Sequence, residues 1–257
     1  MNSPNEIGPR SSMARRIRAA TAALNPTSVS ARPRAVVGGR ERDQPRPPGR
    51  IPRVRPDGPG EPRPAATIIA ARRGANGVEV LVLKRGSEHR FLPGYLAFPG
   101  GAVEPQDGGL ASRWFGSPTE SGRACAVREL IEEAGLALTA AGLVLVARED
   151  RALTAVHASP PPADALREIS HWVAPEEVPV RFDARFFAVD APTGLEPIPD
   201  GAEAEHAWWA RPADVLQDFA EGRCDLYWPT LKTMEALAAC HTVDDVLALH
   251  VPQVEPD

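Results

Sequence analysis

The sequence predicts a mixed α/β (α+β) fold in which strands and helices pack around one mixed β-sheet. Three observations support this prediction. Of the 257 residues, 43% are hydrophobic and 25% are charged, which is enough apolar material for one sizeable core. From about residue 65 onward, β-rich and helical segments are interspersed without a strict strand–helix–strand repeat. No internal repeat indicates a solenoid or a propeller.

The first 64 residues differ in composition from the rest of the chain. They contain 13 arginines, no lysine, five acidic residues and 12 of the 28 prolines. Their net charge is +8, whereas the remaining residues carry −13. Because proline disrupts helices and sheets, we predict a disordered tail over residues 1–64 and a folded domain over residues 65–257. Within the tail, only residues 13–24 have the composition of a short helix.

A β-hairpin is predicted at the start of the folded domain. The strands Ala65–Arg72 and Val78–Arg85 are rich in apolar and β-branched residues, and a glycine-containing turn joins them. A short strand is expected over Tyr95–Phe98, directly before a glycine pair. The further predicted strands are Leu143–Arg148, Arg185–Val189 and Ala207–Ala210, and the further predicted helices are Ala163–Ile169, Pro212–Glu221, Pro229–Ala239 and Val243–His250.

A helix predicted over Thr119–Ala134, with Gly135 as its C-cap, carries three crowded carboxylates. At 100° per residue, Glu129, Glu132 and Glu133 fall on one face, opposite an apolar face. Like charges at this spacing destabilise an exposed helix by roughly 0.2–0.5 kcal/mol per pair. A solvated acidic face is one interpretation, and a site for Mg²⁺ or Mn²⁺, which prefer oxygen ligands, is the other.

Residues 128–136, with the sequence RELIEEAGL, match every fixed position of R-E-U-x-E-E-x-G-U, where U is a bulky aliphatic residue. This stretch resembles the helix half of the Nudix hydrolase box, and the turn Phe98–Gly101 lies upstream, where the loop of that family begins. The resemblance implies a Nudix-type α/β/α sandwich and hydrolysis of phosphoanhydride bonds. It also implies that Glu129, Glu132 and Glu133 hold Mg²⁺ or Mn²⁺.

The full family pattern is G-x5-E-x7-R-E-U-x-E-E-x-G-U, and here 13 extra residues interrupt it. Counting forward from Gly101 reaches Asp107 at the first acidic position, whereas counting back from Arg128 reaches Glu120. The sequence leaves open which of these two acids pairs with Arg128, the residue expected to orient the carboxylates. We expect the insertion, at about residues 106–119, to form a loop beside the site.

An interrupted box of this kind is similar to that of the Nudix subfamily that includes a peroxisomal coenzyme A diphosphatase. Nudix enzymes that act on coenzyme A tend to carry R-[SA]-x3-R-x3-G-x3-F-P-G-G before the box. This chain keeps the spacing, with glycine in place of serine or alanine, through Arg85, Arg90, Gly94, Phe98, Gly100 and Gly101. The resemblance implies that these residues bind substrate, with the two guanidinium groups on its phosphates.

The resemblance also implies a further acid from a distant loop that acts as a base or an extra ligand. Glu205 is the first candidate and Glu203 the second; with Glu129 and Arg128, Glu205 completes the predicted catalytic set. Three functions remain open: a coenzyme A diphosphatase, a hydrolase of ADP-ribose or NADH-type dinucleotides, and a non-catalytic Nudix-fold binding module. The three crowded carboxylates favour an enzyme, because a binding module does not need them.

Other functional classes have little support in the sequence. No G-x-S-x-G nucleophile elbow is present, and the three cysteines form no C-x-x-C pair. No apolar run approaches the length of about 18 residues that a membrane helix needs. We therefore expect a cytoplasmic protein that binds a small nucleoside diphosphate derivative and contacts neither a membrane nor nucleic acid. A homodimer is compatible with the sequence.

Overall fold

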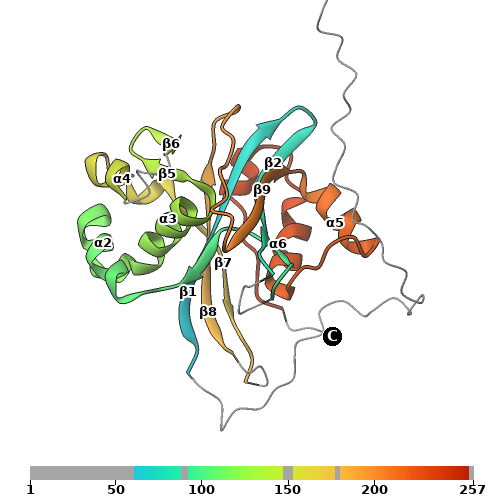
Figure 1. The fold of residues 1–257 in the computed structure, drawn as a ribbon, viewed down its shortest axis with the longest axis horizontal. Helices are drawn as coiled ribbons and strands as arrows, with labels where there is room; N and C mark the ends of the chain where they lie inside the picture. The colour runs from blue at the N-terminus through green and yellow to red at the C-terminus, as the bar shows by residue number, and fades with distance from the viewer. Residues whose placement is uncertain (1–60, 88–91, 147–152, 177–179, 255–257) are drawn as a thin grey trace, which may run out of the picture. The chain divides into compact units, whose positions relative to one another are not determined.

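The computed structural model describes residues 61–87, 92–146, 153–176 and 180–254. They form three layers, with a mixed β-sheet between two groups of helices (Figure 1). This arrangement confirms the fold class predicted from the sequence. The predicted tail up to residue 60, with its candidate helix at 13–24, lies outside the described residues. Among the helices of the described ranges, none combines the length and the hydropathy of a membrane span.

The main sheet has the strand order β3-β2-β1-β8-β7, with β4 paired to β1 and β9 paired to β2. β1 and β8 run parallel, and the other pairs are antiparallel. The strands are β1 (Arg63–Gly74), β2 (Gly77–Arg85), β3 (Leu96–Ala97), β4 (Gly100–Ala102), β7 (Arg167–Val173), β8 (Phe182–Asp190) and β9 (Ala204–Ala210). A separate hairpin consists of β5 (Leu136–Thr139) and β6 (Gly142–Leu145).

β1 begins at Arg63, two residues before the predicted start of the folded domain. Arg63 and Pro64 pair with the first two residues of β8, so the parallel partner extends the strand into the segment predicted to be tail. The predicted hairpin of β1 and β2 is confirmed. Its turn places Gly77 at φ +113°, a conformation that favours glycine.

Each face of the sheet is covered by helices from a different part of the chain (Figure 1). Because side chains alternate along a strand, Ile68 packs in the core beneath α3, whereas its neighbour Ile69 packs in the core beneath α6. The first group comprises α2 (Pro105–Phe115), the 3₁₀ turn η1 (Pro118–Glu120), α3 (Ser121–Ala134) and α4 (Thr154–Ala158), and the second comprises α5 (Pro212–Ala220), α6 (Trp228–Leu237) and α7 (Val243–Leu247).

The predicted helix over Ala163–Ile169 is wrong. Only a 3₁₀ turn, η3 (Ala163–Ala165), forms there, and the chain then enters β7. The local residues include good helix formers, but pairing with β8 allows Ile169 and Trp172 to be buried against the second group of helices. Tertiary pairing therefore overrides the local helix preference.

The insertion at residues 106–119 is not the predicted loop, because it contains most of the 11-residue helix α2. Trp114 anchors this helix: it is buried in the core, and its indole N–H donates to Nδ1 of His157 on α4 at 2.9 Å. Gly116 ends α2 with φ +77°. The extra residues thus add a packed element to the layer that contains α3.

We expect Trp114→Ala to lower the free energy of unfolding by about 3–5 kcal/mol, because it empties a large buried volume and leaves His157 without its donor. Thermal unfolding measured by circular dichroism checks this. The neighbouring change Ser112→Ala, at an exposed position of the same helix, should alter stability by less than about 0.5 kcal/mol. Equal effects of the two changes would contradict the packing of α2.

Candidate active site

Arg128 lies at the centre of a buried network of charged groups on α3. Its guanidinium donates to both carboxylate oxygens of Asp107, at 2.9 and 3.2 Å. It also donates to Glu129 at 2.9 Å, to Glu132 at 2.7 Å and to the carbonyl oxygen of Ala102 at 3.2 Å. Burial by itself would lower the pKa of Arg128, but the bonds to Asp107 and the charge of Glu129 raise it above its usual value. The Arg128 side chain therefore links α2, α3 and β4.

The structure places Asp107 at the acidic position that the interrupted pattern left open. Asp107 is completely buried on α2, where it also accepts the backbone N–H of Glu104 at 2.8 Å. Glu120 instead pairs with Arg123 at the surface, at 2.8 Å. The 13 extra residues therefore lie after the first acid of the box, and the chain returns to α3 through α2 and η1.

Glu129 and Glu133 approach the glycine pair of β4. The Gly100 N–H donates to Oε2 of Glu133 at 2.8 Å. A Cβ atom added to Gly101 would lie 2.1 Å from Oε1 of Glu129, so only glycine permits this approach. Glu203, which precedes β9, brings a third carboxylate, and one oxygen from each of the three acids lies within 4.8 Å of the others. This arrangement of hard oxygen donors can hold a divalent cation.

Burial strongly perturbs two of these three acids. It raises the pKa of Glu133 to about 8, with a further increase from the charge of Glu129; the charge of Arg85 and the Gly100 N–H oppose the shift. Burial likewise raises the pKa of Glu129 to about 7, although Arg128 opposes the shift. The pair is therefore costly to ionise without a positive charge nearby.

Two of the site residues predicted from the sequence lie apart from this cluster. Glu132 turns toward solvent, with its side chain 46% exposed, and pairs with Arg128. Glu205, the first candidate for the distant acid, pairs with Lys84 at 2.9 Å, and the hydrogen bond from Lys84 lowers its pKa. The acid brought into the cluster is Glu203, the second candidate, which directly precedes β9. Glu205 lies two residues further along the chain, within β9.

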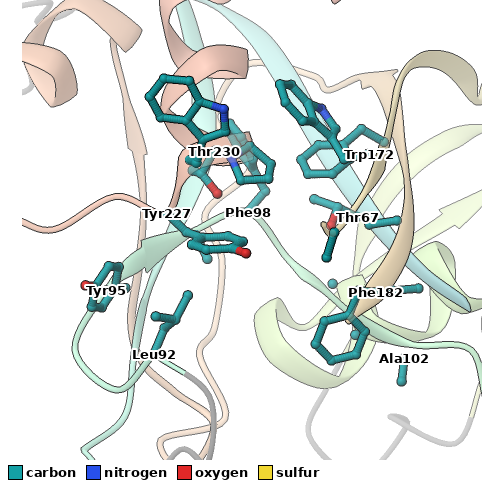
Figure 2. Close-up of a pocket in the computed structure, with 18 of the residues that line it drawn as sticks. Thr67, Leu92, Tyr95, Phe98, Ala102, Trp172, Phe182, Tyr227 and Thr230 are labelled. Atoms are coloured by element: carbon teal, nitrogen blue, oxygen red, sulfur yellow. The ribbon is translucent and has the colours of Figure 1, made fainter. Parts of the chain in front are cut away.

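A pocket of about 360 Å³ extends from the three acids between the main sheet and the start of α6. Figure 2 shows Leu92, Tyr95 and Tyr227 on one side, facing Phe182 and Ala102 on the other, with Phe98 between them. Trp172 from β7 and Thr230 from α6 lie toward one end. The indole N–H of Trp172 is buried without a hydrogen-bond partner among the described residues. The pocket thus combines an acidic wall with a largely aromatic interior.

The predicted substrate-binding residues have different positions. Arg85 at the end of β2, Phe98, Gly100 and Gly101 line the pocket. Gly94 does not line it; it forms the turn before β3 at φ +79°, and its N–H donates to the Arg85 carbonyl at 3.1 Å. Arg90 lies outside the described residues. Of the paired arginines expected from the sequence, the structure thus places only Arg85.

Sequence reasoning missed most of the aromatic lining. Tyr95, Phe182, Tyr227 and Trp228 come from separate places in the chain, and Gln253 and Val254 come from yet another. No spacing connects them, since the sheet and α6 bring them together. Pro229, after Tyr227 and Trp228, marks the start of a helix but does not indicate a pocket.

Comparison with known proteins agrees with the geometry of the site. The profile of the NUDIX domain matches residues 61–227, which is more than half of the chain. The chain belongs to the Nudix family. A NUDIX hydrolase from Alicyclobacillus acidocaldarius is 32% identical over 74% of this chain and 98% of its own length, with a TM-score of 0.65. The Nudix fold and the hydrolase family predicted from the box are confirmed.

A Caenorhabditis elegans relative is named "Putative nudix hydrolase 7". It is 40% identical over 80 residues, which cover 31% of this chain and 24% of the worm protein. This chain therefore spans only about a quarter of the length of that curated relative.

The stability of the metal-free Nudix domain should decrease as the pH rises. A carboxyl whose pKa is higher in the folded state stabilises the fold while it is protonated. For Glu129 and Glu133 this contribution is complete below the ordinary value of 4.5 and is lost as the pH passes about 7 and about 8. We expect the Tm in EDTA to fall between about pH 5.5 and pH 8.5, and Mg²⁺ to reduce the fall.

Glu133→Gln tests this, because the amide oxygen can still accept the Gly100 N–H while the charge is removed. At about pH 8.5 the metal-free variant should be more stable than wild type by roughly 1–2 kcal/mol, or about 2–8 °C in Tm. Scanning calorimetry of the variant and of wild type at about pH 5.5 and about pH 8.5 checks this. An unchanged pH dependence would contradict the buried ionisation.

Asp107→Asn should destabilise the domain by roughly 3 kcal/mol or more, because it removes the buried counter-charge of Arg128. Urea unfolding measures this. Glu120→Gln is the matched control: the Glu120 carboxylate is exposed to solvent, so the change should cost less than about 1 kcal/mol. A larger loss in Glu120→Gln than in Asp107→Asn would reverse the assignment of the first acid.

Proposed function

We propose that this Nudix chain is a Mg²⁺- or Mn²⁺-dependent pyrophosphohydrolase that cleaves the diphosphate of coenzyme A or a closely related nucleoside diphosphate derivative. The observation that supports this most directly is the cluster of Glu129, Glu133 and Glu203 in the wall of an aromatic pocket. Carboxylates meet the metal requirement of phosphoanhydride hydrolysis, and aromatic walls suit the organic groups that flank a diphosphate.

The residues present fit a divalent cation. All donors in the cluster are carboxylate oxygens, and burial keeps two of them reluctant to ionise alone. A bound divalent cation neutralises diphosphate charge and increases the acidity of water. The assignment of Mg²⁺ or Mn²⁺ follows from this donor set, because hard oxygen ligands favour these ions over softer metals.

Each residue of the site has a proposed role. Glu129, Glu133 and Glu203 hold the cation, and Glu203, which is exposed to solvent, also accepts the proton of the attacking water. Arg128 positions the Glu129 carboxylate through their 2.9 Å hydrogen bond.

The substrate is held by its phosphates. Arg85 lines the pocket close enough to Glu133 for its charge to act on that carboxyl, so its guanidinium is placed to bind phosphate oxygens beside the cluster. Gly100 and Gly101 line the pocket beside the cluster, and their lack of side chains makes room for the backbone of β1 and for the Glu129 carboxylate.

Coenzyme A is favoured as substrate by the sequence pattern that contains Arg85, Gly94, Phe98, Gly100 and Gly101, four of which line the pocket. The volume of about 360 Å³ is at the lower end of the range for small-molecule pockets, so it accommodates part of such a substrate. ADP-ribose and NADH-type dinucleotides contain the same diphosphate linkage. They are the alternative outcomes of the substrate test.

Glu203→Gln should lower kcat about 10²–10³-fold with little change in KM, because the cluster loses the carboxylate proposed to accept the proton. Glu205→Gln is the matched control and should change kcat less than about twofold, since Glu205 pairs with Lys84 outside the cluster. Steady-state kinetics on coenzyme A measure both. A large loss of kcat in Glu205→Gln alone would return the role to Glu205.

Incubation with coenzyme A and Mg²⁺ should yield 4′-phosphopantetheine and adenosine 3′,5′-bisphosphate, because water attacks one phosphorus of the diphosphate and the bridging oxygen leaves with the other phosphate. Chromatography with mass detection identifies the products, and reactions with ADP-ribose and NADH run in parallel. Higher kcat/KM for either of these would assign the chain to the dinucleotide alternative. If none of the three compounds is hydrolysed with Mg²⁺ or Mn²⁺, the remaining function is that of a Nudix-fold binding module.

A further inference from the structure

The segment Val251–Val254, here called the strap, runs along the edge of the main sheet after α7. The Val251 N–H donates to the carbonyl of Ile169 on β7 at 2.8 Å, and the Ser170 hydroxyl donates to the Val251 carbonyl at 2.8 Å. Val251 and Ser170 form an isolated parallel β-bridge. The strap thus begins as a short addition to the edge strand β7, and its attachment to the sheet is specific.

Pro252 interrupts this pairing, because proline has no N–H to donate. The next residue restores the attachment through its side chain. The Gln253 amide accepts the Val173 N–H at 2.8 Å and donates to the Val173 carbonyl at 3.1 Å. A side-chain amide therefore satisfies both backbone groups of the last residue of β7, in the way that a neighbouring strand would.

The strap then reaches the opposite wall of the pocket. The indole N–H of Trp228, the first residue of α6, donates to the Val254 carbonyl at 2.7 Å. Val173 and Trp228, the two anchoring residues, both line the pocket, as do Gln253 and Val254 themselves. The strap therefore connects the β7 wall of the pocket to the α6 wall through Val173, the chain neighbour of Trp172, and Trp228, two residues before Thr230.

This end of the pocket is distant from the carboxylates. In the strand order β4-β1-β8-β7, β7 is three strands from β4. Since neighbouring strands lie about 4.8 Å apart, the backbones of β4 and β7 are roughly 14 Å apart. A group that reaches the strap must therefore be a substituent attached to the diphosphate, since the diphosphate itself lies beside Glu129 and Glu133.

We infer that the strap is a specificity-determining element: Gln253 and Val254 form the end wall that limits the size of the organic group joined to the diphosphate. This inference rests on the proposed function of the site. The group is held beside Val254, a residue that is 41% exposed, and the tether of Gln253 to β7 keeps this wall in place. Ligands that consist of a diphosphate alone do not reach the strap.

Binding to wild type and variants, measured by titration calorimetry with Ca²⁺ in place of Mg²⁺, tests this. The probes are coenzyme A, ADP-ribose and methylenediphosphonate, the last of which has no organic group. Val254→Trp fills the end of the pocket while the backbone carbonyl still accepts from Trp228. It should weaken binding of coenzyme A or ADP-ribose at least about tenfold and change methylenediphosphonate affinity less than about twofold.

Gln253→Ala removes the tether and should lower the affinity for coenzyme A or ADP-ribose roughly three- to tenfold. This corresponds to the loss of one or two neutral hydrogen bonds. Gln217→Ala is the matched control, because its amide bonds only to Glu221 on the exposed surface of α5. It should change no affinity. If Gln253→Ala fails to fold, as judged by its Tm, the result for Val254→Trp decides the question.

The inference is overturned if Val254→Trp leaves both organic ligands unaffected, or if all three probes weaken equally. It is also overturned if neither organic ligand binds wild type. The proposed function fails in a different way: wild type would bind coenzyme A or ADP-ribose but hydrolyse neither with Mg²⁺ or Mn²⁺. The binding data would then still show whether the strap limits the pocket.

Discussion

The buried pairing of Arg128 with Asp107 is the interaction on which the rest of the site depends. Neither charge would be stable alone in this position, because removing an ion from water costs several kcal/mol. Together they are almost fully buried, and the guanidinium has donors left for Glu129, Glu132 and the Ala102 carbonyl. The Arg128 guanidinium therefore links α2, α3 and β4 and orients the carboxylate of Glu129, one of the three clustered acids.

The same pairing explains how the box tolerates 13 additional residues. Asp107 lies in the first turn of α2, before the extra residues, so its spacing from Gly101 is that of the uninterrupted pattern. The extra chain leaves the site along α2 and returns through η1 to α3, while Trp114 fixes the excursion to α4. The insertion thus lengthens the covalent path without moving the acid away from its arginine.

The two sides of the pocket are formed by different parts of the chain. Its acidic wall comes mainly from one helix and the β4 turn, whereas its aromatic lining and the strap come from β7, β8, the start of α6 and the segment after α7. A change at the strap can therefore alter which group is bound without touching the carboxylates.

The sequence by itself determined the elements whose cause is local. The hairpin of β1 and β2, the α3 carboxylate helix and its end at Gly135 follow from patterns of neighbouring residues, as does the family. Tertiary structure alone decided that residues 167–173 form a strand, that Asp107 rather than Glu120 meets Arg128, and that Glu203 rather than Glu205 joins Glu129 and Glu133. Each of these depends on burial and on partners that belong to another element, and spacing along the chain named the candidate acids without deciding between them.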